Sequence, residues 1–330
     1  MRVNRLITAV LSFALLLSAA ACSSAGNTVP DAADSGTSQG VAAEGISADS
    51  PSADALPADD DYLDRLSYEV KFLLDPQKVL DDAHLLTEDW RQTFGITEDY
   101  QPIEVMYLET PEKDFLQEGW INRLRLKSGK KKVERTYKKR YPVSGEDIAA
   151  ALKTAEQEGF VLPEKTEKKA QKDEETAKGV FEAGIDWGYE KMTLSFSTED
   201  SAKMKGHDSL TSVTDDEAKA FLLSAMPDIE ADWKQSQWGI TTLDRSMAVG
   251  PVRLLRAKGM LENREVTVEI CPVTTKDKEE KSYIVELSFK ADDFEEASDG
   301  RAQLTEYLDQ KGILLHEDSL KTTKILDAWF

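Results

Sequence analysis

The stretch INRLRLKSGKKKVERTYKKRY, residues 121–141, decides the fold because its charged and apolar side chains alternate. Arg123 and Arg125 fall on one side of an extended segment, and the leucine that follows each of them falls on the other side. Successive side chains of a strand point to opposite faces, so the pattern describes two faces and not composition alone. A Ser-Gly pair between the two halves is typical of a hairpin turn. The stretch therefore predicts two paired strands, each with one buried face and one charged face.

Further segments alternate in the same way. Glu69 and Lys71 share one face of the first, and Glu286 lies on the charged face of the last. The apolar faces must be buried, so the charged faces meet either open water or the inside of a closed, wet barrel. An antiparallel sheet with one wet face produces the same alternation and is the simpler interpretation of the strands alone. The segments concerned are residues 67–74, 134–141 and 283–290.

The pattern as a whole predicts the α+β class, with about eight strands that are mostly antiparallel and helices between them. Eight strands suit a small closed barrel. Ser144 precedes one expected helix, 146–158, and Thr214 with Glu217 caps another, 214–226. Strands are expected at residues 63–74, 103–107, 120–127, 133–141, 185–197, 252–260, 265–271 and 283–290, and further helices at 76–90, 228–238 and 293–311.

The start of the chain predicts its location. Residues 1–21 contain two arginines, a short apolar run and small residues that lead to Cys22. This resembles a bacterial lipoprotein signal, which implies cleavage before Cys22 and a lipid on that residue; an ordinary secretory signal is the alternative. Residues 22–58 are rich in Ala, Ser, Gly and Asp and predict a disordered tether, followed by a folded domain at 59–330. We therefore expect a cell-envelope protein, lipid-anchored to the membrane on its extracytoplasmic side.

Composition limits the partners. The chain has 62 acidic and 41 basic residues, a net charge of −21. Such a surface disfavours nucleic acid, so a basic site has to be local and enclosed. If Cys22 carries a lipid, Cys271 is the one thiol left, and an internal disulfide is not possible. The Lys/Glu-rich excursion at 164–178 predicts a solvated segment.

Short motifs along the chain carry a family resemblance. They are Glu69-x-Lys71, Tyr107-x-Glu109-Thr110-Pro111, Arg123-x-Arg125, Thr136-x-Lys138, Glu286 and Lys321-x-x-Lys324. In this order the chain, from about residue 64 to its end, resembles the triphosphate tunnel metalloenzymes, or CYTH superfamily. The resemblance implies an eight-stranded antiparallel closed barrel of the triphosphate-tunnel type with flanking helices. Its polar lumen is expected to bind phosphate chains with Mg²⁺ or Mn²⁺.

The predicted site residues follow from this resemblance and from phosphate chemistry. A triphosphate carries about four negative charges and needs several cations from different walls, among which arginine offers forked donors. Mg²⁺ takes oxygen ligands, so carboxylates are needed as well. The predicted phosphate-binding residues are Lys71, Arg123, Arg125, Lys138, Arg256, Lys321 and Lys324. The predicted metal ligands are Glu69, Glu269 and Glu286, and the predicted catalytic residues are Glu69, Lys71 and Glu286.

The chain departs from the family pattern at three positions. Ser67 and Ser288 stand where the superfamily often carries Glu, and Glu109 stands where Asp is usual. Serine adds no negative charge, so two likely metal-facing carboxylates are missing. A site with fewer carboxylates resembles the VTC-type polyphosphate-polymerase branch of the superfamily. Two functions stay open. One is an anchored lipoprotein with a tunnel that binds tri-/polyphosphate or a nucleoside triphosphate with a divalent metal, with hydrolysis of the bound chain left open. The other is a non-catalytic polyanion-binding or scaffold lipoprotein that keeps the barrel but has lost metal carboxylates.

Overall fold

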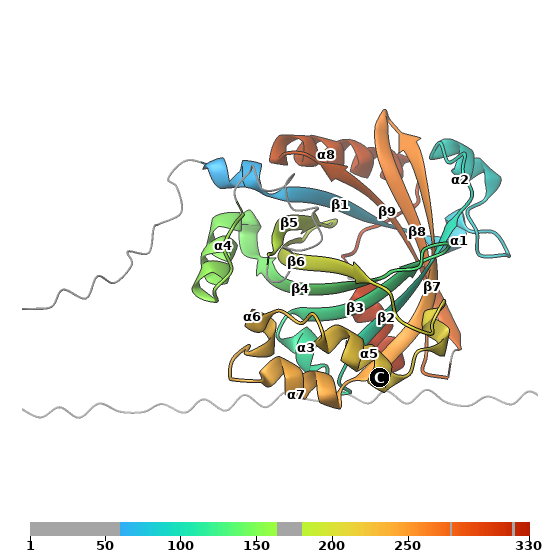
Figure 1. Cartoon of the computed structure of the whole chain (residues 1–330). Coiled ribbons are helices and arrows are strands. Elements are labelled where there is room, and N and C mark those ends of the chain that lie inside the picture. The colour runs from blue at the N-terminus through green and yellow to red at the C-terminus, as the bar shows by residue number, and fades with distance from the viewer. Residues whose placement is uncertain (1–59, 164–179, 278, 319–320) are drawn as a thin grey trace, which may run out of the picture. The chain divides into compact units, whose positions relative to one another are not determined.

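The computed structural model describes residues 60–163, 180–277, 279–318 and 321–330 (Figure 1). The predicted signal at 1–21, the lipidation site Cys22, the tether at 22–58 and the Lys/Glu-rich excursion at 164–178 lie outside these residues and stay predictions. Within the described part, none of the helices combines the length and the apolar character that crossing a bilayer requires.

Nine strands form a closed barrel. Their order is β1-β5-β6-β4-β3-β2-β7-β8-β9, and the ring closes because β9 pairs with β1. Every neighbouring pair in this ring is antiparallel except β1 and β5, which run parallel. The short β10 (Leu314–Leu315) pairs with the end of β1. The strands are β1 Ser67–Leu74, β2 Gln101–Glu109, β3 Trp120–Lys127, β4 Val133–Val143, β5 Glu182–Trp187, β6 Met192–Ala202, β7 Met247–Leu261, β8 Arg264–Thr274 and β9 Glu280–Ala291.

The closed barrel with flanking helices confirms the predicted architecture, but the predicted eight antiparallel strands are wrong in detail. Residues 185–197 were expected to form one strand, and the structure divides them between β5 and β6. The backbone N–H of Gly188 donates to the carbonyl of Lys191, which turns the chain. The Asp318 carboxylate accepts from the backbone N–H groups of Glu190 and Lys191 and so stabilises the turn. Alternation runs through both strands, which hid the break between them.

Helices cover the outside of the barrel, except for the C-terminal helix, which packs against the inward-facing residues at one end. Thr214 and Glu217 form the predicted capping box of α5, and Asp293 caps α8. The single helix expected at 76–90 is instead two short helices, α1 and α2. The helices are α1 Pro76–Val79, α2 Glu88–Thr93, α3 Asp114–Gln117, α4 Ile148–Gln157, α5 Asp215–Leu223, α6 Asp228–Ala231, α7 Trp238–Arg245, α8 Phe294–Gln310 and α9 Lys321–Trp329, with short 3-10 turns at Asp60–Arg65, Ser144–Glu146 and Leu210–Ser212.

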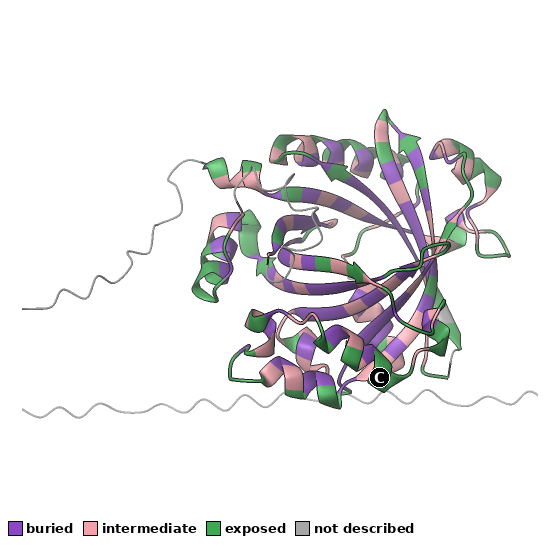
Figure 2. Cartoon of the chain, in the orientation of Figure 1, coloured by how far each residue is buried: buried purple, intermediate pink, exposed green. Residues whose placement is uncertain are grey.

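Two apolar cores position the lumen. Burial alternates along the strands (Figure 2), and the outer core lies between the sheet and the helices. A second core lies inside the barrel and fills one of its ends; we call it the apolar floor. It includes Ile325 and Leu326 of α9, which are 1% and 2% exposed. Its members are Leu73, Ile103, Val105, Tyr107, Ile121, Val249, Val252, Leu254, Cys271, Val273, Ile284, Ile325 and Leu326.

Candidate functional site

The rest of the lumen is a charged cavity of about 840 Å³. Among the residues that the structure describes, ten basic and seven acidic residues line it, an excess of three positive charges in a chain whose net charge is −21. The basic residues are Lys71, Arg123, Arg125, Lys127, Lys138, Arg140, Arg256, Lys258, Lys290 and Lys321. The acidic residues are Glu69, Glu182, Asp186, Glu199, Glu265, Glu269 and Glu286. The cations come from separate strands and from α9, as an enclosed anion site requires.

Four charged residues of β7, β8, β9 and α9 form a group of balanced charge in the cavity wall. Glu269 and Glu286 face each other across β8 and β9. The Lys321 ammonium donates to Glu269 and, at 3.0 Å, to Glu286, and Arg256 Nε donates to Glu269 at 2.7 Å. Burial raises the pKa of Glu269, but Lys321 and Arg256 outweigh this effect and hold it at about 2. We call Arg256, Glu269, Glu286 and Lys321 the C-terminal wall; its two cations and two anions neutralise one another.

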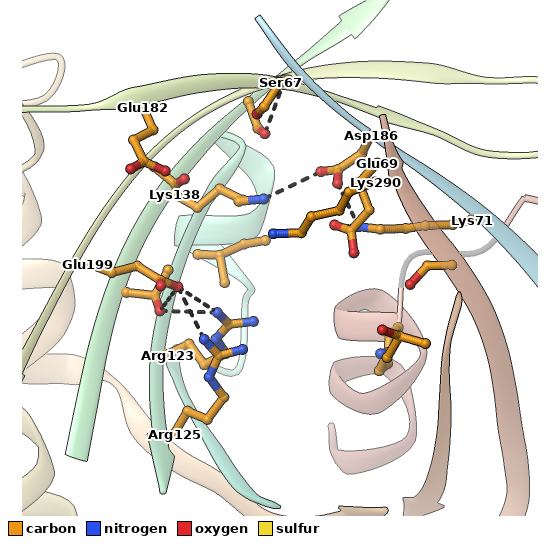
Figure 3. A pocket seen from close by; sticks show the side chains of 18 of the residues that line it. Ser67, Glu69, Lys71, Arg123, Arg125, Lys138, Glu182, Asp186, Glu199 and Lys290 are labelled. Atoms are coloured by element: carbon orange, nitrogen blue, oxygen red, sulfur yellow. Dashed lines mark hydrogen bonds and ion pairs between the residues drawn. The ribbon is translucent and has the colours of Figure 1, made fainter. Parts of the chain in front are cut away.

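A second group of charges joins β1, β4 and β5. Lys71 Nζ donates to Asp186 Oδ1 at 2.5 Å and lies 3.1 Å from Glu69 Oε2 (Figure 3). Lys138 Nζ reaches the other oxygen of Asp186 at 3.4 Å. Burial raises the pKa of Asp186, but Lys138 and Lys71 bring it well below its usual range. Asp186 is therefore an anion that two lysines share.

The arginines of β3 lie side by side, as their spacing of two predicts. Glu199 Oε1 accepts from Arg123 Nη2 at 3.1 Å and lies 3.6 Å from Arg125 Nη2 (Figure 3). Arg125 Nε donates to Glu134, and Arg123 Nη2 donates to Thr136 Oγ1 at 3.1 Å. A carboxylate oxygen thus already occupies a position between two guanidinium groups, where a phosphate oxygen can accept the same bonds.

Arg140 of β4 completes this side of the cavity and was not predicted as a site residue. It follows Thr136 and Lys138 on the same face of the strand, so the alternation that revealed Lys138 also contained Arg140. Its Nε and Nη1 atoms are buried and have no hydrogen-bond partner in the described part of the chain. We call Arg123, Arg125, Lys138 and Arg140 the basic wall. Asp186 and Glu199 were missed as well, because each is a single acidic residue outside any motif.

The structure brings together all but one of the predicted lumen residues. Lys324 is the exception: it is absent from the cavity lining, and its ammonium lies 3.1 Å from Glu317 Oε1, with both side chains exposed. It lies about one helical turn beyond Lys321 on α9, where its side chain is exposed. The predicted residues that line the cavity are Glu69, Lys71, Arg123, Arg125, Lys138, Arg256, Glu269, Glu286 and Lys321.

Glu109 of the Tyr107-to-Pro111 motif has a structural role. Its carboxylate is buried and accepts the backbone N–H groups of Thr110, Phe115 and Leu116 at 2.9, 3.0 and 2.9 Å. These bonds hold the turn between β2 and α3. Burial raises the pKa of Glu109 to about 7, while the three donors act in the opposite direction. The motif therefore shapes the loop at this end of the barrel.

The carboxylates predicted to bind Mg²⁺ or Mn²⁺ do not share one site. In the described part of the chain, no group of three or more His, Cys, Asp or Glu residues is arranged to hold a metal ion. Glu69 pairs with Lys71, while Glu269 and Glu286 share the Lys321 ammonium. The Ser67 hydroxyl donates to the carbonyl of Ala183 at 3.2 Å. Lysine therefore stands where a divalent cation would need free carboxylate oxygens, and these residues do not fit a resident metal.

No protein-family model and no curated protein matches the chain. Among solved structures, it is similar to a proposed adenylyl cyclase from Hippeastrum described as having a dominant triphosphatase activity (TM-score 0.47, 11% identity, 79% of this chain and 96% of that chain). It is also similar to a proposed adenylate cyclase from Bacillus halodurans (TM-score 0.43, 14% identity, 78% of this chain and 96% of that chain).

Proposed function

We propose that this protein is a CYTH-like barrel whose lumen binds the phosphate chain of a tri- or polyphosphate or of a nucleoside triphosphate. The observation that carries the proposal is the excess of cations in an enclosed cavity of an otherwise acidic chain. A net charge of −21 repels polyanions from the outer surface, so the basic lumen is the place where a phosphate chain gains affinity.

The basic wall provides the donors. Arg123 and Arg125 are half-buried, and their partner Glu199 has a side chain that is 44% exposed. An exposed carboxylate can move into solvent at little cost when a more highly charged phosphate takes its position. Hydrogen bonds to charged groups contribute about 1.5–3 kcal/mol each, and the enclosed lumen screens them less than open water does.

The same contacts favour binding without turnover. The lumen carboxylates predicted to bind metal are held by lysine and arginine, so hydrolysis assisted by a resident metal has no ligand set in the described residues. The lipid anchor and the extracytoplasmic location are part of the proposal and rest on residues 1–58 alone.

Isothermal titration calorimetry of the purified protein with sodium tripolyphosphate tests the proposal. Replacing both arginines (Arg123→Gln with Arg125→Gln) should weaken binding by about 100-fold or more, since each lost charged bond is worth about tenfold. Arg253→Gln is the matched control, because Arg253 is exposed and absent from the cavity lining. Absence of binding to the wild type, or equal binding by the double variant, would contradict the proposal.

A parallel assay measures phosphate release from tripolyphosphate and from nucleoside triphosphates, with and without Mg²⁺ or Mn²⁺. We expect no release above that of the buffer. Metal-dependent phosphate release by the wild type that is absent from the double arginine variant would show that the lumen hydrolyses the phosphate chain and does not only bind it.

A further inference from the structure

The lumen is open at one end and closed at the other. At one end of β7 and β8, the side chains of Lys258 and Glu265 are 63% and 66% exposed. The side chain of Arg256, two residues before Lys258 on β7, is 26% exposed. The side chain of Glu269, four residues after Glu265 on β8, is 9% exposed. Beyond them lies the apolar floor, against which α9 packs. A ligand therefore enters from the exposed end and stops at the floor.

Arg140 lies at the inner end of the basic wall. On β4 it follows Lys138, which pairs in register with Ile121 of the apolar floor. Tyr107, another floor residue, lies near Arg140, together with Asp186 and Arg123. The guanidinium is thus at the depth where the charged cavity meets the floor.

No neighbour satisfies this guanidinium. Its Nε and Nη1 atoms are buried without a hydrogen-bond partner, and no carboxylate of the described residues forms an ion pair with it. Burial lowers the pKa of Arg140, and Asp186 compensates only in part. Buried polar groups of native proteins are nearly always hydrogen-bonded, and a buried cation without a partner is costly. The neighbouring Lys138, by contrast, pairs with Asp186.

We infer that Arg140 binds the terminal phosphate of a linear chain that enters the lumen end-first, which makes a free phosphate end the feature that the site selects. The inference rests on the proposed function and adds the ligand class to it. A terminal phosphate carries about −1.5 to −2 charge near neutral pH, more than an internal one, and offers more oxygens to a forked donor. In a cavity with a closed inner end, only the end of a chain reaches the floor.

Cyclic trimetaphosphate is the discriminating probe, because it is a ring of phosphates without an end. Calorimetry should show that the wild type binds linear tripolyphosphate at least about tenfold more tightly than the ring, the value of one charged bond. Pyrophosphate, which is linear and similar to the ring in charge, should also bind more tightly than the ring. If the wild type binds neither linear nor cyclic phosphate, the proposed function fails; if it binds both equally, this inference alone fails.

Arg140→Met tests the residue. We expect a loss of about 10- to 100-fold in tripolyphosphate affinity, the value of one or two charged hydrogen bonds, and loss of the linear-over-cyclic preference. The melting temperature without ligand should equal or exceed that of the wild type, because the variant removes a buried unpaired charge. Arg253→Met, on the exposed surface, should change neither quantity. Unchanged tripolyphosphate binding by Arg140→Met, or an unchanged preference, would overturn the inference.

Arg140→Lys separates binding from a role in folding. Lysine keeps the charge but not the fork, so we expect intermediate affinity and a reduced preference for linear phosphate. If both variants instead melt at lower temperature than the wild type and bind linear and cyclic phosphates in the wild-type ratio, Arg140 is a structural residue and the inference is wrong.

Discussion

The C-terminal wall and the basic wall line the same lumen but neutralise their charges to different degrees. In the first, Lys321 and Arg256 are matched by Glu269 and Glu286, at distances that include 2.7 and 3.0 Å. In the second, Arg140 has two buried nitrogens without a partner. The difference indicates that a charged lumen residue is not in itself a ligand-binding residue. Cations held closely by buried carboxylates of their own stabilise the barrel, whereas cations whose partners are absent, exposed or shared with another cation are available to an anion.

The largest expected effect comes from removing a cation of the C-terminal wall. Lys321→Met leaves Glu269 and Glu286 side by side without their shared ammonium, and loss of one partner of a buried ion pair costs about 3–5 kcal/mol. Chemical denaturation should therefore show a large fall in the free energy of unfolding. Adding Glu286→Gln to this variant should recover part of the loss, because it removes the uncompensated charge. A single variant as stable as the wild type would mean that the lumen is wet enough to solvate both carboxylates.

The second effect is a sensitivity to acid. The pKa of Glu269 is held at about 2 in the folded protein against an ordinary value of 4.5. Because the folded pKa is the lower one, the stabilisation is complete above about pH 4.5 and is lost as the pH falls towards 2, by roughly 2–3 kcal/mol. Unfolding free energies measured across this window should fall with pH, and Glu269→Gln should have a shallower slope. Equal slopes would show that other carboxylates control acid unfolding.

The alternation of charged and apolar residues predicted most of the residues that line this lumen. In a strand, the period of two assigns each residue to one face, independently of which strands pair with it. Arg123, Arg125, Lys138 and Glu286 therefore line the cavity as expected. The pairing of those charges could not be predicted in the same way. Lys321 lies between Glu269 and Glu286 because of the register of β8 with β9 and the position at which α9 packs. Contacts between residues far apart in the chain determine both.

Two errors have similar physical causes. Lys324 was placed in the lumen because a K-x-x-K motif has no face until its helix is docked, and docking buries Ile325 and Leu326 instead. The barrel was given eight strands because the alternation of charged and apolar residues does not reveal a tight turn such as that at Gly188. Hydrogen bonds to Asp318, which is distant in the sequence, stabilise this turn. Arg140, in contrast, could have been found, since it continues the face of Thr136 and Lys138.

Lys138 tests whether the basic wall is less important for folding than the C-terminal wall. Its contact with Asp186 is long, at 3.4 Å, and Lys71 holds the same carboxylate at 2.5 Å. Lys138→Met should therefore change the unfolding free energy by less than about 1 kcal/mol, because Asp186 keeps a partner. Tripolyphosphate affinity should fall about tenfold through the lost cation. A loss of stability as large as that of Lys321→Met would remove the distinction between the two walls.

The smallest effect is expected at Lys324, and it separates position in the motif from position in the fold. Lys321 and Lys324 belong to one K-x-x-K motif, but only Lys321 lines the cavity. Exposed ion pairs such as that of Lys324 with Glu317 contribute about 0–1 kcal/mol, so Lys324→Ala should lower the unfolding free energy by no more than about 1 kcal/mol. Its tripolyphosphate affinity should stay within about twofold of the wild type. Calorimetry and denaturation of this variant are the matched control for Lys321→Met. A clear loss of affinity would mean that bound phosphate extends past the floor to the outer face of α9, which the closed lumen does not allow.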